Sequence, residues 1–127
     1  IPTGGYEIAK SVNNSWKWAG GGFISTTENI AEFLNKHSTD GYLSQKSLDI
    51  LMKSQATIDG NKTDYGIGWR IRYGNNGEKL YGHTGGSVGG TTYAFMNPNT
   101  KTIVVITSNI GSANFGKLPL DIFEVYN

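Results

Sequence analysis

The chain contains no cysteine, which excludes disulfide bonds and thiolate metal sites. Its only two histidines, His37 and His83, lie far apart, and no His-Glu-x-x-His motif is present. No run of about 18 apolar residues occurs, which excludes a membrane-spanning helix of ordinary length. The net charge is only +1, so electrostatics gives no reason to expect nucleic acid as a partner. We therefore predict no metal, no cofactor and no nucleic-acid binding.

A chain of 127 residues is long enough for one domain with a real core and too short for two. A hydrophobic content of 37% and a charged content of 17% are typical of a globular protein. Residues 1–5 have neither the basic region nor the apolar stretch of a signal peptide. We expect a single folded unit.

Two helices are predicted in the first half of the chain. Ser25 and Glu28 match a capping box at the start of a helix over residues 26–37. Ser44 is placed to cap a second, shorter helix. The apolar face of the first helix, at helical spacing, comprises Ile30, Phe33, Leu34 and the boundary core residue His37, and that of the second comprises Leu48, Leu51, Met52 and Gln55.

Strand patterns follow from residue 65. Residues 65–73 alternate, and a tight turn at residues 75–77 leads to a strand over 79–84. Strands over 91–96 and 102–107 come next, and Pro119 opens a short C-terminal helix. Residues 103–107 are apolar on both faces, which predicts a place in the middle of a covered sheet. The predicted fold is α+β, an antiparallel sheet of about four strands flanked by helices.

Two further patterns have competing interpretations. The aromatic residues Tyr6, Trp16, Trp18, Tyr65 and Trp69 could form a platform that stacks on sugars or peptides, but packing against the sheet is the commoner role. Residues 111–117 are spaced like a phosphate-binding loop. However, Leu118 stands where that loop needs a hydroxyl, so a surface loop is predicted. Lys10, Lys17, Arg70 and Arg72 form no run and are expected at the solvated surface.

The candidate site residues are His83, Thr84, Gly85 and Gly86, at the end of a predicted strand. A basic side chain and a hydroxyl are followed there by two glycines. Because glycine has no Cβ, the backbone can approach a bound carbonyl group closely. This pattern predicts one wall of a site that binds a small-molecule or peptide substrate.

Four segments in order resemble the C-terminal part of the serine beta-lactamase and penicillin-binding-protein-like hydrolases. They are residues 19–26 (AGGGFIST), 65–69 (YGIGW), 82–86 (GHTGG) and 103–109 (IVVITSN). The similarity is closest to class C lactamases, D-stereospecific peptidases and related esterases. Histidine rather than lysine at position 83 favours the peptidase or esterase relatives.

The resemblance implies acyl transfer by a serine on amide, lactam or ester bonds. His83 and Thr84 would orient the substrate and the proton-transfer network, and the backbone N–H of Gly86 would be one of two oxyanion donors. No cofactor is implied. A periplasmic or extracellular bacterial location would follow from the same resemblance.

The chain departs from the family in one respect that matters. Members carry a Ser-x-x-Lys nucleophile, and no lysine here has serine three residues before it. We therefore interpret residues 1–127 as a single partial domain that lacks its N-terminal part and is inactive alone. The exposed sheet edge that this leaves predicts strand pairing between copies of the chain. The alternative is a non-catalytic module that binds peptide or glycan.

Overall fold

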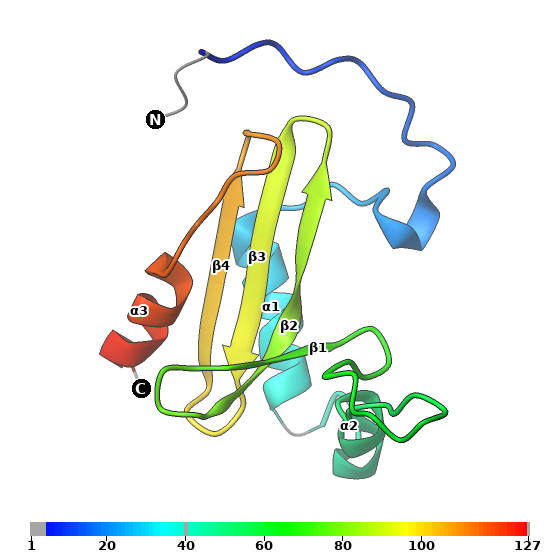
Figure 1. The fold of residues 1–127 in the computed structure, drawn as a ribbon, viewed down its shortest axis with the longest axis vertical. Helices are drawn as coiled ribbons and strands as arrows, with labels where there is room; N and C mark the ends of the chain where they lie inside the picture. Colours follow the sequence, from blue (N-terminus) through cyan, green and yellow to red (C-terminus); the bar gives the residue numbers. More distant parts are fainter. Residues whose placement is uncertain (1–4, 40, 127) are drawn as a thin grey trace.

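The structure, a computed structural model, describes residues 5–39 and 41–126. Its elements in chain order are η1 (Trp18–Gly20), α1 (Thr27–Ser38), α2 (Gln45–Leu51), β1 (Arg70–Tyr73), β2 (Lys79–Ser87), β3 (Gly90–Asn97), β4 (Thr102–Ser108) and α3 (Leu118–Tyr126). The strands form one antiparallel sheet in the order β1-β2-β3-β4 (Figure 1). The predicted α+β arrangement is confirmed.

One face of the sheet packs against α3. Phe95 in β3 is fully buried there beside Tyr93, and Phe123 of α3 is equally buried against them. Leu80 and Val104 complete this cluster from the neighbouring strands. Phe123 thus anchors the C-terminal helix to the sheet, whereas Tyr126 near the end of the helix is exposed.

The opposite face of the sheet packs against α1. Leu34 of the helix and Trp69, just before β1, are buried with Ala94 and Met96 of β3. His37 is also buried, and its Nδ1 lies 2.7 Å from the Phe33 carbonyl oxygen. The prediction that His37 is a residue at the boundary of the core is confirmed.

The start of α1 differs from the expected capping box. Thr26, not Ser25, is the N-cap, and its hydroxyl oxygen accepts from the Asn29 backbone N–H at 3.2 Å. Thr26 has the extended backbone that a cap requires, so the helix begins one residue later than predicted. The Ser44 cap of α2 is confirmed by a 3.2 Å bond from the Ser47 N–H, although α2 ends at Leu51, before Gln55.

Two strand predictions need correction. Residues 65–69 form a loop, because Gly66 donates to the Trp69 carbonyl at 2.7 Å and Gly68 has φ +76°, leaving only Arg70–Tyr73 as β1. β2, in contrast, does not stop at Thr84 but continues through both glycines to Ser87. Gly85 and Gly86 are therefore part of the strand, and the chain turns only at residues 88–89.

β4 lies at an edge of the sheet and not in its middle, within the described residues. Its apolar run is nevertheless covered on both faces, with Val104 packed in the α3 cluster and Val105 in the α1 cluster. Two-sided covering by helices, and not a central position, accounts for the continuous apolar pattern of this strand.

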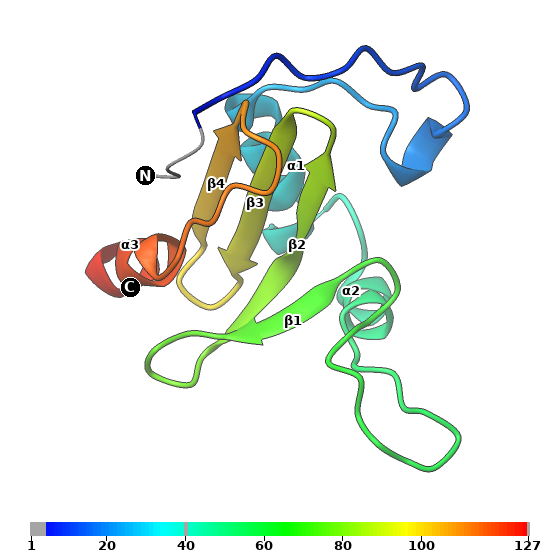
Figure 2. The same cartoon turned by 45° about the horizontal axis from the view of Figure 1, so that its top comes forward.

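The N-terminal aromatic residues are not packed against the sheet as expected. Tyr6, Trp16 and Trp18 are 68%, 71% and 80% exposed, and they belong to a segment that runs across one end of the sheet (Figures 1 and 2). Trp69 alone among the five predicted packing residues is buried. Residues 111–117 lie in loop and turn conformation, as predicted.

Gly82 is the point where β2 can carry no side chain. A Cβ there would lie 2.6 Å from the Phe95 Cα, with the Ala94 carbonyl oxygen closer still. We expect Gly82→Ala to lower the free energy of unfolding by about 1–3 kcal/mol, because backbone must shift to admit the methyl group. Urea unfolding measures this, with Gly85→Ala as the control because a Cβ at Gly85 meets nothing within 4 Å. Equal unfolding midpoints for the two variants would show that Gly82 is not a close-packing position.

Candidate active site

β2 has one edge that is only half covered by its neighbour. β1 pairs with it as far as Arg70 opposite Gly82, and residues 83–87 pair only with β3 on the other edge. Figure 2 shows the upper half of β2 running on beyond β1. The outer edge of residues 83–87 therefore has no strand partner in the part of the chain that the structure describes.

The hairpin register decides which backbone groups face this open edge. β2 and β3 are joined by a two-residue turn closed by Ser87 opposite Gly90. In such a hairpin the closing residues form a hydrogen-bonded pair, and hydrogen-bonded and non-hydrogen-bonded pairs then alternate. Gly86 opposite Thr91 and Thr84 opposite Tyr93 are thus non-hydrogen-bonded pairs. Their N–H and C=O groups point away from β3, toward the open edge.

The two glycines leave space on either side of the strand. Both are exposed, and an added Cβ at Gly85 or Gly86 would meet no atom within 4 Å. Neither glycine has a positive φ, so the backbone conformation does not require glycine at these two positions. Close approach of another molecule is the remaining physical use for glycine at these positions.

His83 is exposed and makes two polar contacts. Its Nε2 lies 2.7 Å from the Tyr65 hydroxyl oxygen, and its Nδ1 lies within hydrogen-bond distance of the Thr84 carbonyl oxygen. The Tyr65 and His83 rings meet edge-to-face with centroids 5.6 Å apart. The imidazole is therefore held in one orientation at the open edge.

Thr84 lies on the other face of the sheet from His83, because side chains alternate along a strand. Its neighbour across the ladder is Tyr93, whose buried hydroxyl has no hydrogen-bond partner among the residues described. Burial raises the pKa of Tyr93 to about 12, and the nearby Arg72 guanidinium opposes that rise. Tyr93 is therefore neutral near pH 7 and adds no charge beside Thr84.

The structure thus places all four predicted site residues along one strand edge, with side chains on two faces and not in one enclosed cavity. Two contacts at this edge were not predicted. Tyr65 was expected only to pack, and Lys17 only to be solvated, yet Lys17 Nζ donates to the Ser87 hydroxyl at 3.3 Å. Neither contact has a signal in sequence spacing, since the partners are far apart in the chain.

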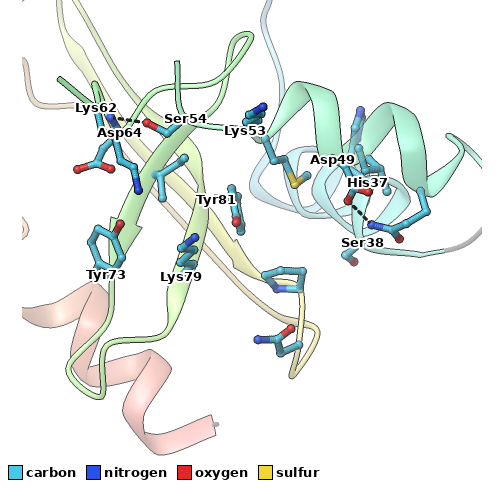
Figure 3. Close-up of a pocket in the computed structure, with 16 residues that line it drawn as sticks. His37, Ser38, Asp49, Lys53, Ser54, Lys62, Asp64, Tyr73, Lys79 and Tyr81 are labelled. Carbon is cyan, nitrogen blue, oxygen red and sulfur yellow. Dashed lines mark hydrogen bonds between the residues drawn. The ribbon is translucent and has the colours of Figure 1, made fainter. Parts of the chain in front are cut away.

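A cavity of about 590 Å³ lies elsewhere, between α2, β1 and the start of β2 (Figure 3). Its polar lining includes Asp49, Lys53, Asp64, Tyr73 and Lys79, and it does not include the four predicted residues. The described residues contain no group of three or more His, Cys, Asp or Glu side chains that could hold a metal ion. They also contain no helix that is long and apolar enough to cross a membrane.

Comparison with known families adds to this geometry. A family model described as Beta-lactamase matches residues 2–125, which is nearly the whole chain. The match covers every helix and all four strands, including the open edge of β2. Only the last residue of α3 lies outside it. The chain belongs to the beta-lactamase family.

Proposed function

We propose that the open edge of β2 is one wall of an acyl-transfer site. The reaction is attack of a serine hydroxyl on an amide, lactam or ester carbonyl, followed by release of the acyl group to water. The observation that carries this proposal is the unpaired edge of residues 83–87, with the Gly86 N–H directed outward. Membership of a serine hydrolase family supports the same chemistry.

Each predicted residue has a role at this edge. The Gly86 N–H donates to the oxygen that becomes negatively charged when the serine attacks, as one of two such donors. His83 and Thr84 orient the substrate and the groups that exchange protons with it. The glycines at 85 and 86 let the acyl group lie directly against the backbone.

The nucleophile must come from outside these 127 residues, because no Ser-x-x-Lys occurs in them. We propose that the partner of this chain is the N-terminal part of the same domain, which carries the serine in the family. The exposed aromatic side chains of residues 6–24 and the open edge of β2 are surfaces that such a part can cover.

The chain alone is expected to hydrolyse neither a chromogenic lactam nor a p-nitrophenyl ester above the rate in buffer. Hydrolysis should appear when the chain is joined to a family segment that carries Ser-x-x-Lys, which we call the joined protein. A variant of the joined protein with that serine changed to alanine is the control. Robust turnover by the isolated chain would contradict the proposal, and so would turnover that survives loss of the serine.

A second function, non-catalytic binding of peptide or glycan, is favoured by one observation. Trp16 and Trp18 are largely exposed, and Lys17 Nζ lies 5.8 Å from the Trp16 ring centroid. Exposed aromatic rings can stack on sugars or peptides. Titration of tryptophan fluorescence with cell-wall peptides or sugars tests this alternative, and saturable binding by the inactive chain would favour it over acyl transfer.

The outer edge of β4 supports a separate proposal, that copies of the isolated chain associate by strand pairing. Sedimentation at rising concentration should show a dimer, and Thr107→Lys should weaken it because a charge on an exposed edge position opposes pairing. Ile58→Lys, in a fully exposed loop, is the matched control. A compact monomer at all concentrations, or equal effects of the two lysines, would refute strand pairing at β4.

A further inference from the structure

We propose that Tyr65 is a positioning residue for His83, which holds the imidazole in one orientation at the open edge of β2. The importance of that imidazole in acyl transfer rests on the function proposed above. The contact itself rests on geometry alone. It joins a loop residue to a strand residue across a large separation in the chain, with 2.7 Å between the Tyr65 Oη and the His83 Nε2.

The Tyr65 backbone is held on both sides. Its carbonyl oxygen accepts from the Gln55 N–H at 2.8 Å, and its own N–H donates to the Thr63 hydroxyl oxygen at 3.3 Å. Tyr65 also forms an isolated bridge with Arg70, the first residue of β1. The loop of residues 65–69 therefore does more than connect α2 to the sheet, since it fixes the phenol beside β2.

The partners of the imidazole determine its tautomer. A carbonyl oxygen can only accept, so the Nδ1 that faces the Thr84 carbonyl carries the proton. In the neutral ring Nε2 is then an acceptor, and the Tyr65 hydroxyl donates to it. Without the tyrosine hydroxyl, Nε2 would face solvent, because His83 is exposed.

This arrangement has a consequence for the site. An exposed imidazole on a strand is free to change its rotamer and tautomer, whereas a site that orients a substrate needs its groups held closely. Tyr65 is half-buried and meets the His83 ring edge-to-face, so it limits rotation of the imidazole. The neutral imidazole therefore presents a fixed face, with its Nε2 lone pair already occupied.

The test is nitrogen-15 NMR of the 127-residue chain labelled at histidine, which distinguishes the two neutral tautomers. We expect His83 to be in the Nδ1–H form. In Tyr65→Phe the Nδ1–H form should persist, because the Thr84 carbonyl oxygen still accepts from Nδ1. The Nε2 resonance should shift, because Nε2 loses the hydroxyl that donates to it and the ring is no longer held in one orientation. The phenylalanine ring keeps the packing, so the fold should be unchanged.

Two controls separate positioning from a general change in structure. Tyr81→Phe removes a hydroxyl from the same face of β2, two residues from His83, and should leave the His83 signals unchanged. His37, buried in α1, is an internal reference in every spectrum. An unchanged His83 Nε2 resonance in Tyr65→Phe, or equal shifts in both tyrosine variants, would overturn the proposal. The NMR measurement requires no turnover, so failure of the acyl-transfer proposal would appear separately, in the hydrolysis assay of the joined protein.

Discussion

Replacement of Phe95 by alanine is expected to lower the free energy of unfolding by about 3–5 kcal/mol. Phe95 of β3 is fully buried, opposite Gly82 of β2 and Val104 of β4. Leu80 of β2 and Phe123 of α3 belong to the same buried cluster. The Arg72 guanidinium also lies 5.3 Å from the Phe95 ring centroid. Truncation removes all these contacts and leaves a cavity in a cluster that joins three strands to a helix.

Urea unfolding followed by circular dichroism measures this loss. Phe23→Ala is a matched control because it deletes the same atoms from a side chain that is 81% exposed, and its effect should stay within about 0.5 kcal/mol. Similar losses in the two variants would mean that the sheet is not packed around Phe95. Such a result would also remove the support on which the β2 edge depends.

Gly86→Pro in the joined protein is expected to lower kcat by about 10²–10³-fold. Proline has no backbone N–H, so the substitution deletes the proposed oxyanion donor. The strand should survive, because the Gly86 N–H points to the open edge of β2 and no ladder bond to Thr91 is lost. Hydrolysis of a p-nitrophenyl ester under saturating conditions measures the effect.

Gly86→Ala is the control for Gly86→Pro. Alanine keeps the N–H, and a Cβ at this position meets no atom within 4 Å of the chain, so any loss should come only from contact with substrate. Equal kcat for the proline variant and the parent would show that Gly86 is not an oxyanion donor.

Much of the fold follows from local sequence patterns. The two helices, the Ser44 cap and the strand of residues 102–107 depend on residues within one turn or one strand, and the structure confirms these elements. The family resemblance in ordered motifs is confirmed by the match over residues 2–125. The helix and strand patterns are set by local hydrophobic spacing, which a single sequence displays directly.

The features that were wrong depend on competition between similar local choices. Ser25 and Thr26 are both suitable caps, and the backbone of Thr26 decides between them. Alternation in residues 65–73 indicates a strand, but Gly66 and Gly68 allow a loop there instead. The predicted strand over 79–84 stops before Gly85 and Gly86, yet pairing with β3 keeps both glycines extended. Tertiary contacts settle each case, and one sequence does not display them.

The candidate site was also predictable from the sequence only in part. The GHTGG motif locates the strand edge, but nothing near it in the sequence identifies Tyr65 as the partner of His83. A contact between residues 18 positions apart arises only because β1 leaves β2 at Gly82 and places the preceding loop beside the open edge. Contacts made by topology in this way are not visible in motif spacing.

The most direct measurement of the proposed role of the β2 edge is a structure of the joined protein with an acyl group on its serine. The acyl carbonyl oxygen should lie about 2.7–3.1 Å from the Gly86 nitrogen, at the open edge of β2. A carbonyl oxygen held by other donors, with no contact to residues 83–87, would contradict this account.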